Sequence, residues 1–212
     1  MENLEFKQKL AEYLLQIKAI HFNLQNPYTW ASGWKSPMYC DNRLILSYPD
    51  VRNFVRDGLV QMVQAYFPDA DCIAGVATAG IPHATMIADH LNLPLIYVRS
   101  KPKEHGRENL IEGELKHGMR VVVIEDTIST GGSSLQAVEA LRKQGAEVVG
   151  MCAIYKYGFD VARKRFEESG VTLKTLTNYD YVLRAGIESN YIDDVALVEL
   201  KKWVSQPDAW NK

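Results

Sequence analysis

The stretch of residues 120–134, RVVVIEDTISTGGSS, constrains the fold of this chain more than any other. Four apolar residues, 121–124, run directly into the acid pair Glu125-Asp126, and a loop of hydroxyls and glycines follows. A helical pattern then opens at Ser133, with apolar residues at positions 135, 138 and 141. This order is typical of a buried strand whose carboxyl end leads through a phosphate-binding loop into a helix.

The loop and the acid pair predict two different kinds of contact. Backbone N–H groups of the loop and of the helix N-terminus can hold a phosphate dianion, which the helix dipole also favours. Glu125 and Asp126 would repel that anion, so we expect them to bind neutral hydroxyls or a cation. Adjacent acids usually mark a solvated strand end, but these acids close a buried strand and precede a glycine-rich loop. A phosphorylated sugar with vicinal hydroxyls satisfies both groups.

Short apolar strands alternate with helical patterns through the middle of the chain. Strands are predicted at residues 71–76, 95–98, 121–124, 148–154 and 171–177, and helices between them at 81–91 and 133–143. This alternation predicts an α/β fold with a mostly parallel sheet. Further helices are predicted at 5–22, 48–66, 179–187 and 193–204. The segment 30–41 has Ser32-Gly33 between aromatic-rich runs, which predicts a small antiparallel cap.

Composition limits the classes of protein that this chain can belong to. It has 212 residues, is 47% apolar and 24% charged, and is long enough for one domain with a substantial core. The net charge of −2 gives no argument for binding nucleic acid or an acidic membrane. No apolar stretch reaches the ~18 residues of a membrane span, and the N-terminus lacks a signal-peptide core. We therefore expect a cytoplasmic protein.

Two further loops follow predicted strands and would lie at the same edge of the sheet. The first, GVATAGIPHA at residues 75–84, is a small-residue turn before a helix, and beside the first loop it fits a diphosphate site. The second, residues 99–113, reads RSKPKEHGRENLIEG and carries Arg99, Lys101, Lys103, His105 and Arg107. A solvated basic loop is the ordinary interpretation of such a run, but its place after a strand points it toward the phosphate loops.

The sequence EDTISTGGSS resembles the phosphoribosyl-pyrophosphate (PRPP) binding motif of type I phosphoribosyltransferases. The whole chain, including YCDNR and RSKPKEHG, resembles the orotate phosphoribosyltransferase family. The resemblance implies the type I fold, a central mostly parallel sheet flanked by helices with a small N-terminal hood. It also implies one domain over residues 1–212. The hood would come mainly from residues 1–45 with part of the C-terminal region, and the core from about 46–177.

The same resemblance implies roles for individual residues. Glu125 and Asp126 would contact the ribose hydroxyls, and Ser129 would also reach orotate. Lys103, His105 and Asp126 would be the catalytic residues. The remaining PRPP contacts would be Arg99, Thr127, Ile128, Ser129, Thr130, Gly131, Gly132 and Ser133.

The implied reaction transfers the 5-phosphoribosyl group from PRPP to orotate, giving orotidine 5'-phosphate and diphosphate in de novo pyrimidine biosynthesis. Mg²⁺ would be the cofactor, bound mainly through PRPP and without dedicated protein ligands. The protein would be a homodimer whose loop 99–113 serves the neighbouring subunit's site.

This chain departs from the pattern of some relatives at four places. It has Thr78-Ala79 where some relatives have an aromatic–lysine pair, and Ala31 and Ser100 where some have lysines. The arginine that some relatives place after strand 148–154 is missing, and Lys156 lies in that segment instead. Two alternatives therefore stay open. A purine-base phosphoribosyltransferase would keep the PRPP loop but prefer another base. A non-catalytic PRPP-sensing regulator would normally add a nucleic-acid-binding extension or lose the basic residues of loop 99–113.

Overall fold

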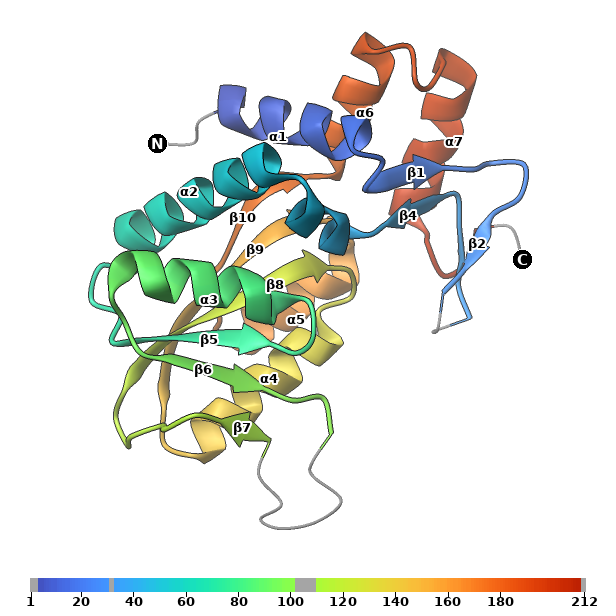
Figure 1. Ribbon diagram of the computed structural model, residues 1–212. Helices are drawn as coiled ribbons and strands as arrows, with labels where there is room; N and C mark the ends of the chain where they lie inside the picture. The colour runs from blue at the N-terminus through green and yellow to red at the C-terminus, as the bar shows by residue number, and fades with distance from the viewer. Residues whose placement is uncertain (1–3, 31–32, 102–109, 211–212) are drawn as a thin grey trace.

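The computed structural model describes residues 4–30, 33–101 and 110–210. These residues form a central six-stranded sheet, whose course can be followed in Figure 1. Its strand order is β10-β9-β8-β5-β6-β7, and all neighbours are parallel except β6 and β7. The strands are β5 (Cys72–Val76), β6 (Leu95–Val98), β7 (Ile111–Glu112), β8 (Arg120–Ile128), β9 (Glu147–Lys156) and β10 (Leu173–Asn178). The predicted α/β fold with a mostly parallel sheet is confirmed.

Helices cover both faces of this sheet. On one face lie α1 (Leu4–Gln16), α2 (Pro49–Tyr66) and α3 (Gly80–Leu91), and on the other lie α4 (Gly132–Lys143) and α5 (Asp160–Glu168) (Figure 1). Consecutive residues of β8 point to opposite faces of the sheet. Val122 and Ile124 pack in the core formed with α1, α2 and α3, and Val121 and Val123 pack in the core formed with α4 and α5. All four are fully buried, which explains why the strand reads as an unbroken apolar run.

Two small antiparallel sheets, which we call the hood, lie beside the carboxyl ends of the main strands. In the hood, β1 (Ile20–Phe22) pairs with β4 (Met38–Cys40), and β2 (Tyr28–Thr29) pairs with β3 (Lys35–Ser36). The predicted antiparallel cap is therefore confirmed, although residues 31–32 of its turn lie outside the described residues. A 3-10 helix, η1 (Asn42–Ser47), connects the hood to α2.

The C-terminal helices pack against the hood and α1. They are α6 (Tyr179–Glu188) and α7 (Asp194–Ser205). The indole N–H of Trp203, a fully buried residue of α7, donates a 3.1 Å hydrogen bond to the Lys35 carbonyl of β3. None of the helices in the described ranges combines the length and hydropathy that a membrane crossing requires.

The predicted helix over residues 5–22 was wrong at its C-terminal end. The helix stops at Gln16, and Ile20–Phe22 forms strand β1. Lys18 has a left-handed backbone (φ 57°), and the N–H of Ala19 reaches back to the Leu14 carbonyl at 2.9 Å. This helix end normally uses glycine, so a lysine there gives no sequence signal.

The lengths and number of elements also differ from the prediction. Strand β8 continues through the acid pair to Ile128, because β9 is long enough to pair with it as far as Lys156. Strand β7 and helix α5 had no predicted counterpart. Helix α5 buries only Ala162 and Phe166, a stripe too narrow to be recognised from periodicity.

Candidate active site

The predicted phosphate loop joins the end of β8 to the start of α4. Its turn is made at Gly131, which has a left-handed backbone (φ 77°), so a glycine is favoured there. A Cβ on Gly131 would also lie 2.9 Å from the Phe166 ring. From α5, the Arg165 guanidinium donates a 3.0 Å hydrogen bond to the Thr130 carbonyl. The loop is thus fixed by its backbone and by α5, and the N-terminus of α4 follows directly.

The residues predicted to bind phosphate differ in how open they are. Ser129, Thr130 and Gly132 are half-buried, and Ser133 is exposed at the start of α4. Ile128 is 1% exposed and packs in the core beneath α4, and its carbonyl accepts a hydrogen bond from the N–H of Tyr157. Ile128 can therefore offer a ligand only its backbone, whereas the serine and threonine residues can offer hydroxyls.

The two acids lie side by side in sequence but have different surroundings. The side chain of Glu125 is buried (6% exposed), and its Oε2 accepts a 3.0 Å hydrogen bond from the Ser134 hydroxyl. Its Oε1 accepts the backbone N–H of Asp126 at 3.1 Å. Burial, reinforced by the negative charge of Asp126, raises the pKa of Glu125 well above its ordinary value. Asp126 is only half-buried and is the more accessible acid.

One buried residue contacting this site was not among the predicted site residues. Asn42, at the start of η1, donates from Nδ2 to Thr127 Oγ1 (2.8 Å) and to the Asp126 carbonyl (3.1 Å). Asn42 belongs to the YCDNR stretch that supported the family resemblance. Because more than 80 residues separate it from the loop, no local spacing could indicate this contact.

The second predicted loop, at the end of β5, lies next to the first. Gly75 of β5 pairs with Ile124 of β8, and α3 begins at Gly80. A Cβ on Gly80 would lie 2.5 Å from the Ile124 carbonyl oxygen, so only glycine allows this approach of α3 to β8. The two loops predicted to share one edge of the sheet therefore follow adjacent strands.

His83, on α3, is 1% exposed and faces the same region. Its Nδ1 has no hydrogen-bond partner among the described residues. Burial lowers the pKa of His83 to about 4, and the charge of Asp126 opposes that shift. His83 is therefore a neutral core residue close to the acid pair. The described residues contain no cluster of three or more His, Cys, Asp or Glu side chains suited to hold a metal ion.

Arg99 begins the basic loop just after β6. Its N–H donates to the Leu110 carbonyl (2.8 Å), and its guanidinium lies 3.5 Å from the carboxylate of Glu112 on β7. The antiparallel pair β6–β7 thus brackets the basic loop at one end of the sheet. Lys103 and His105, two of the predicted catalytic residues, lie outside the described residues.

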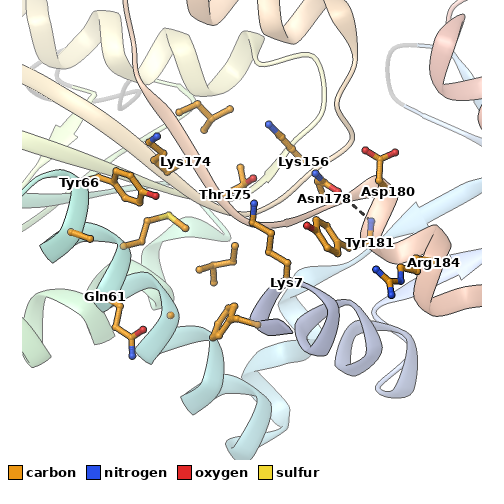
Figure 2. A pocket seen from close by; sticks show the side chains of 16 residues that line it. Lys7, Gln61, Tyr66, Lys156, Lys174, Thr175, Asn178, Asp180, Tyr181 and Arg184 are labelled. Atoms are coloured by element: carbon orange, nitrogen blue, oxygen red, sulfur yellow. Dashed lines mark hydrogen bonds between the residues drawn. The ribbon is translucent and has the colours of Figure 1, made fainter. Parts of the chain in front are cut away.

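A cavity of about 720 Å³ lies elsewhere, along β10 at the other end of the sheet (Figure 2). Side chains of α1, α2, β10 and α6 line it, among them Lys7, Lys174 and Arg184. The Lys174 ammonium lies 4.2 Å from the centre of the Tyr66 ring, and Arg184 pairs with Glu188 at 2.9 Å. Neither the acid pair nor the phosphate loop lines this cavity.

Comparison with known proteins identifies the family. The family model described as "Phosphoribosyl transferase domain" matches residues 47–182, which include both phosphate loops and the acid pair. An orotate phosphoribosyltransferase of Cytophaga hutchinsonii is 50% identical over 209 residues, covering 99% of this chain and all of that protein. One from Bacteroides thetaiotaomicron is 55% identical over 211 residues, covering 100% of this chain and 99% of that one. The chain belongs to the orotate phosphoribosyltransferase family.

A solved structure supports the same assignment at the level of the fold. The crystal structure of orotate phosphoribosyltransferase from Aeropyrum pernix superposes with a TM-score of 0.73 at 28% identity, covering 87% of this chain and 99% of that one. The type I phosphoribosyltransferase fold expected from the sequence is therefore confirmed. The full-length matches to orotate phosphoribosyltransferases also favour this family over the purine-base and regulatory alternatives.

Proposed function

We propose that this member of the orotate phosphoribosyltransferase family transfers the 5-phosphoribosyl group of PRPP to orotate at the carboxyl end of β8. The products are orotidine 5'-phosphate and diphosphate, a step of pyrimidine biosynthesis. The structural observation that best supports this function is the arrangement of residues where β8 leads into α4. There a glycine turn and a helix N-terminus adjoin two carboxylates that differ in exposure. The loop 129–133 would hold the 5-phosphate, and Asp126 would accept hydrogen bonds from the ribose hydroxyls.

In this reaction the active site must mainly stabilise developing charge and exclude water. Positive charge grows on the ribose ring as diphosphate departs, and the Asp126 carboxylate beside the ring would stabilise it. N1 of orotate is already acidic, so the attacking nitrogen needs no dedicated protein base. Water must be excluded because it would hydrolyse PRPP wastefully. Ser129, half-buried at the start of the loop, would also reach the base.

Mg²⁺ is the cofactor that we propose. The half-buried Asp126 carboxylate beside a phosphate-binding loop offers the oxygen chemistry that this ion prefers. When bound, the ion would supply positive charge that offsets the charge on the departing diphosphate. It would take most of its ligands from PRPP itself.

The basic loop would complete the site from a neighbouring subunit of a homodimer. Strand β7 ends the sheet and is separated from β8 by β6 and β5, so both described ends of the loop adjoin strands that do not pair with β8. Arg99, Lys103 and His105 would then contact the PRPP of the partner subunit and stabilise the departing diphosphate. A cytoplasmic location, without nucleic-acid or membrane partners, is part of this proposal.

The direct test is a spectroscopic assay of orotate consumption with PRPP and Mg²⁺. We expect rapid loss of orotate and formation of diphosphate, with adenine, guanine and xanthine giving little or no product. Turnover of a purine in preference to orotate would assign the other base class. PRPP binding without turnover of any base would support a regulator instead.

A further inference from the structure

Asn42 contributes a buried amide that joins the hood segment to the acid pair. It lies two residues after the end of β4, and its side chain is fully buried. Its Nδ2 lies 2.8 Å from Thr127 Oγ1 and 3.1 Å from the backbone oxygen of Asp126. A backbone carbonyl can only accept hydrogen bonds, so the amide nitrogen, and not the amide oxygen, must face the loop.

The hydrogen bonds around Asn42 form a chain in which each side chain donates to the next. The Cys40 thiol donates to Asn42 Oδ1 over 3.5 Å, and burial raises the pKa of this thiol, which keeps it protonated. Asn42 then donates to the Thr127 oxygen, so the single proton of that hydroxyl is free to point elsewhere. It points to Asp126 Oδ2, which lies 3.3 Å away. The Cys40 sulfur also lies within hydrogen-bond reach of Thr127, but the Asp126 carboxylate is the stronger acceptor for the hydroxyl proton.

We infer that Asn42 is a positioning residue, which orients the Thr127 hydroxyl toward Asp126 and so holds that carboxylate for the ribose of PRPP. The inference rests on the proposed role of Asp126. Because Asn42 lies only two residues after β4, it also ties the phosphate-binding loop to the hood. Without the amide, the Thr127 hydroxyl could rotate away, and Asp126 would lose a fixed donor.

Substitutions at the two ends of the Asn42–Thr127 contact test this inference. We expect Asn42→Ala and Thr127→Val each to weaken PRPP binding roughly tenfold, the usual effect of one buried hydrogen bond. Thr127→Ser keeps the hydroxyl and should bind PRPP almost as the parent protein does. The exposed residue Asn53 on α2 supplies the matched control, and Asn53→Ala should leave PRPP affinity unchanged.

The decisive experiment is a double-mutant cycle read by titration calorimetry with PRPP and Mg²⁺, with thermal unfolding measured in parallel. If Asn42 acts through Thr127, the double variant loses much less affinity than the product of the two single losses. Losses that multiply fully would overturn the inference, and so would parent-like affinity in Asn42→Ala. If Asn42→Ala does not fold, the Thr127 pair decides: equal affinity in Thr127→Val and Thr127→Ser also overturns it.

A variant of Asp126 separates this inference from the proposal beneath it. Asp126→Asn should lose PRPP binding in the same calorimetric titration. If it does so while Asn42→Ala binds PRPP normally, only the role of Asn42 fails. If Asp126→Asn binds PRPP normally, the ribose contact itself is wrong, and the role inferred for Asn42 fails with it.

Discussion

The hydroxyl of Ser134 donates a 3.0 Å hydrogen bond to Oε2 of Glu125, which joins the first turn of α4 to the end of β8. Both side chains are buried, at 2% and 6% exposed. The other oxygen of Glu125 accepts the N–H of Asp126. The contacts of Glu125 are therefore largely within the protein, whereas the half-buried Asp126 is better placed to meet a substrate.

Replacing Glu125 by glutamine should change how stability depends on pH. The pKa of Glu125 is raised in the folded state, so its contribution to stability is full at low pH and is lost as pH rises through the folded pKa. Glu125→Gln removes this loss. We expect the unfolding free energy of the variant, relative to that of the parent protein, to increase as pH is raised from about 5 to about 8, as measured by urea unfolding. An equal difference at both pH values would contradict the raised pKa.

His83 predicts a pH dependence on the acid side. Its pKa is lowered to about 4 in the folded protein, below the ordinary value of 6.5, so the neutral imidazole stabilises the fold above about pH 6.5. That contribution is lost as pH falls through 4, and the difference corresponds to about 3 kcal/mol. His83→Asn should therefore show a shallower loss of unfolding free energy between about pH 6.5 and about pH 4. Parallel pH profiles for the two proteins would exclude a buried neutral His83.

Gly131 and Gly118 form a matched pair for testing the phosphate loop. Their φ angles are 77° and 78°, but a Cβ would meet Phe166 at Gly131 and nothing within 4 Å at Gly118. We expect Gly118→Ala to lower the free energy of unfolding by about 1 kcal/mol, from backbone strain alone. Gly131→Ala should cost about 2 kcal/mol or more and should also weaken PRPP binding, since the loop must shift. Equal costs, with PRPP affinity intact in both, would show that the loop tolerates a side chain.

Mixing two inactive variants tests whether the basic loop serves the neighbouring subunit. Lys103→Ala should lower turnover far more than PRPP affinity, and Asp126→Asn should abolish binding at the phosphate loop. In a mixed dimer, one site would combine an intact acid pair with an intact loop from the other subunit. Up to about a quarter of parental activity should therefore return when subunits are exchanged at equal amounts, from random pairing with one intact site per mixed dimer. No recovery despite proven exchange would place each loop at its own site.

The sequence predicted the sheet and the site loop because their signals are local. Both faces of β8 are buried, so its core residues read as an apolar run, and the glycine turn follows within the same stretch. The site could be placed because parallel strands bring their carboxyl ends to one edge. Those two rules were enough to predict that the loops containing Gly80 and Gly131 are neighbours.

Other features depend on contacts between distant segments and could not be predicted. The amide of Asn42 reaches a hydroxyl 85 residues away, and no spacing encodes that. The unequal burial of Glu125 and Asp126 arises from packing against α4, although the two residues look equivalent in the sequence. The end of α1 at Lys18 lacks the glycine that usually marks such a turn.

Titration calorimetry of PRPP with Mg²⁺, on the parent protein and on Asp126→Ala, tests the central claim most directly. The parent protein should release or absorb measurable heat with one PRPP per subunit, and the variant should lose that heat while unfolding at a similar temperature. Asp126 is only half-buried, so the variant removes a carboxylate that is not part of the core. Heat that persists unchanged in Asp126→Ala would contradict the assignment of the ribose to this end of β8.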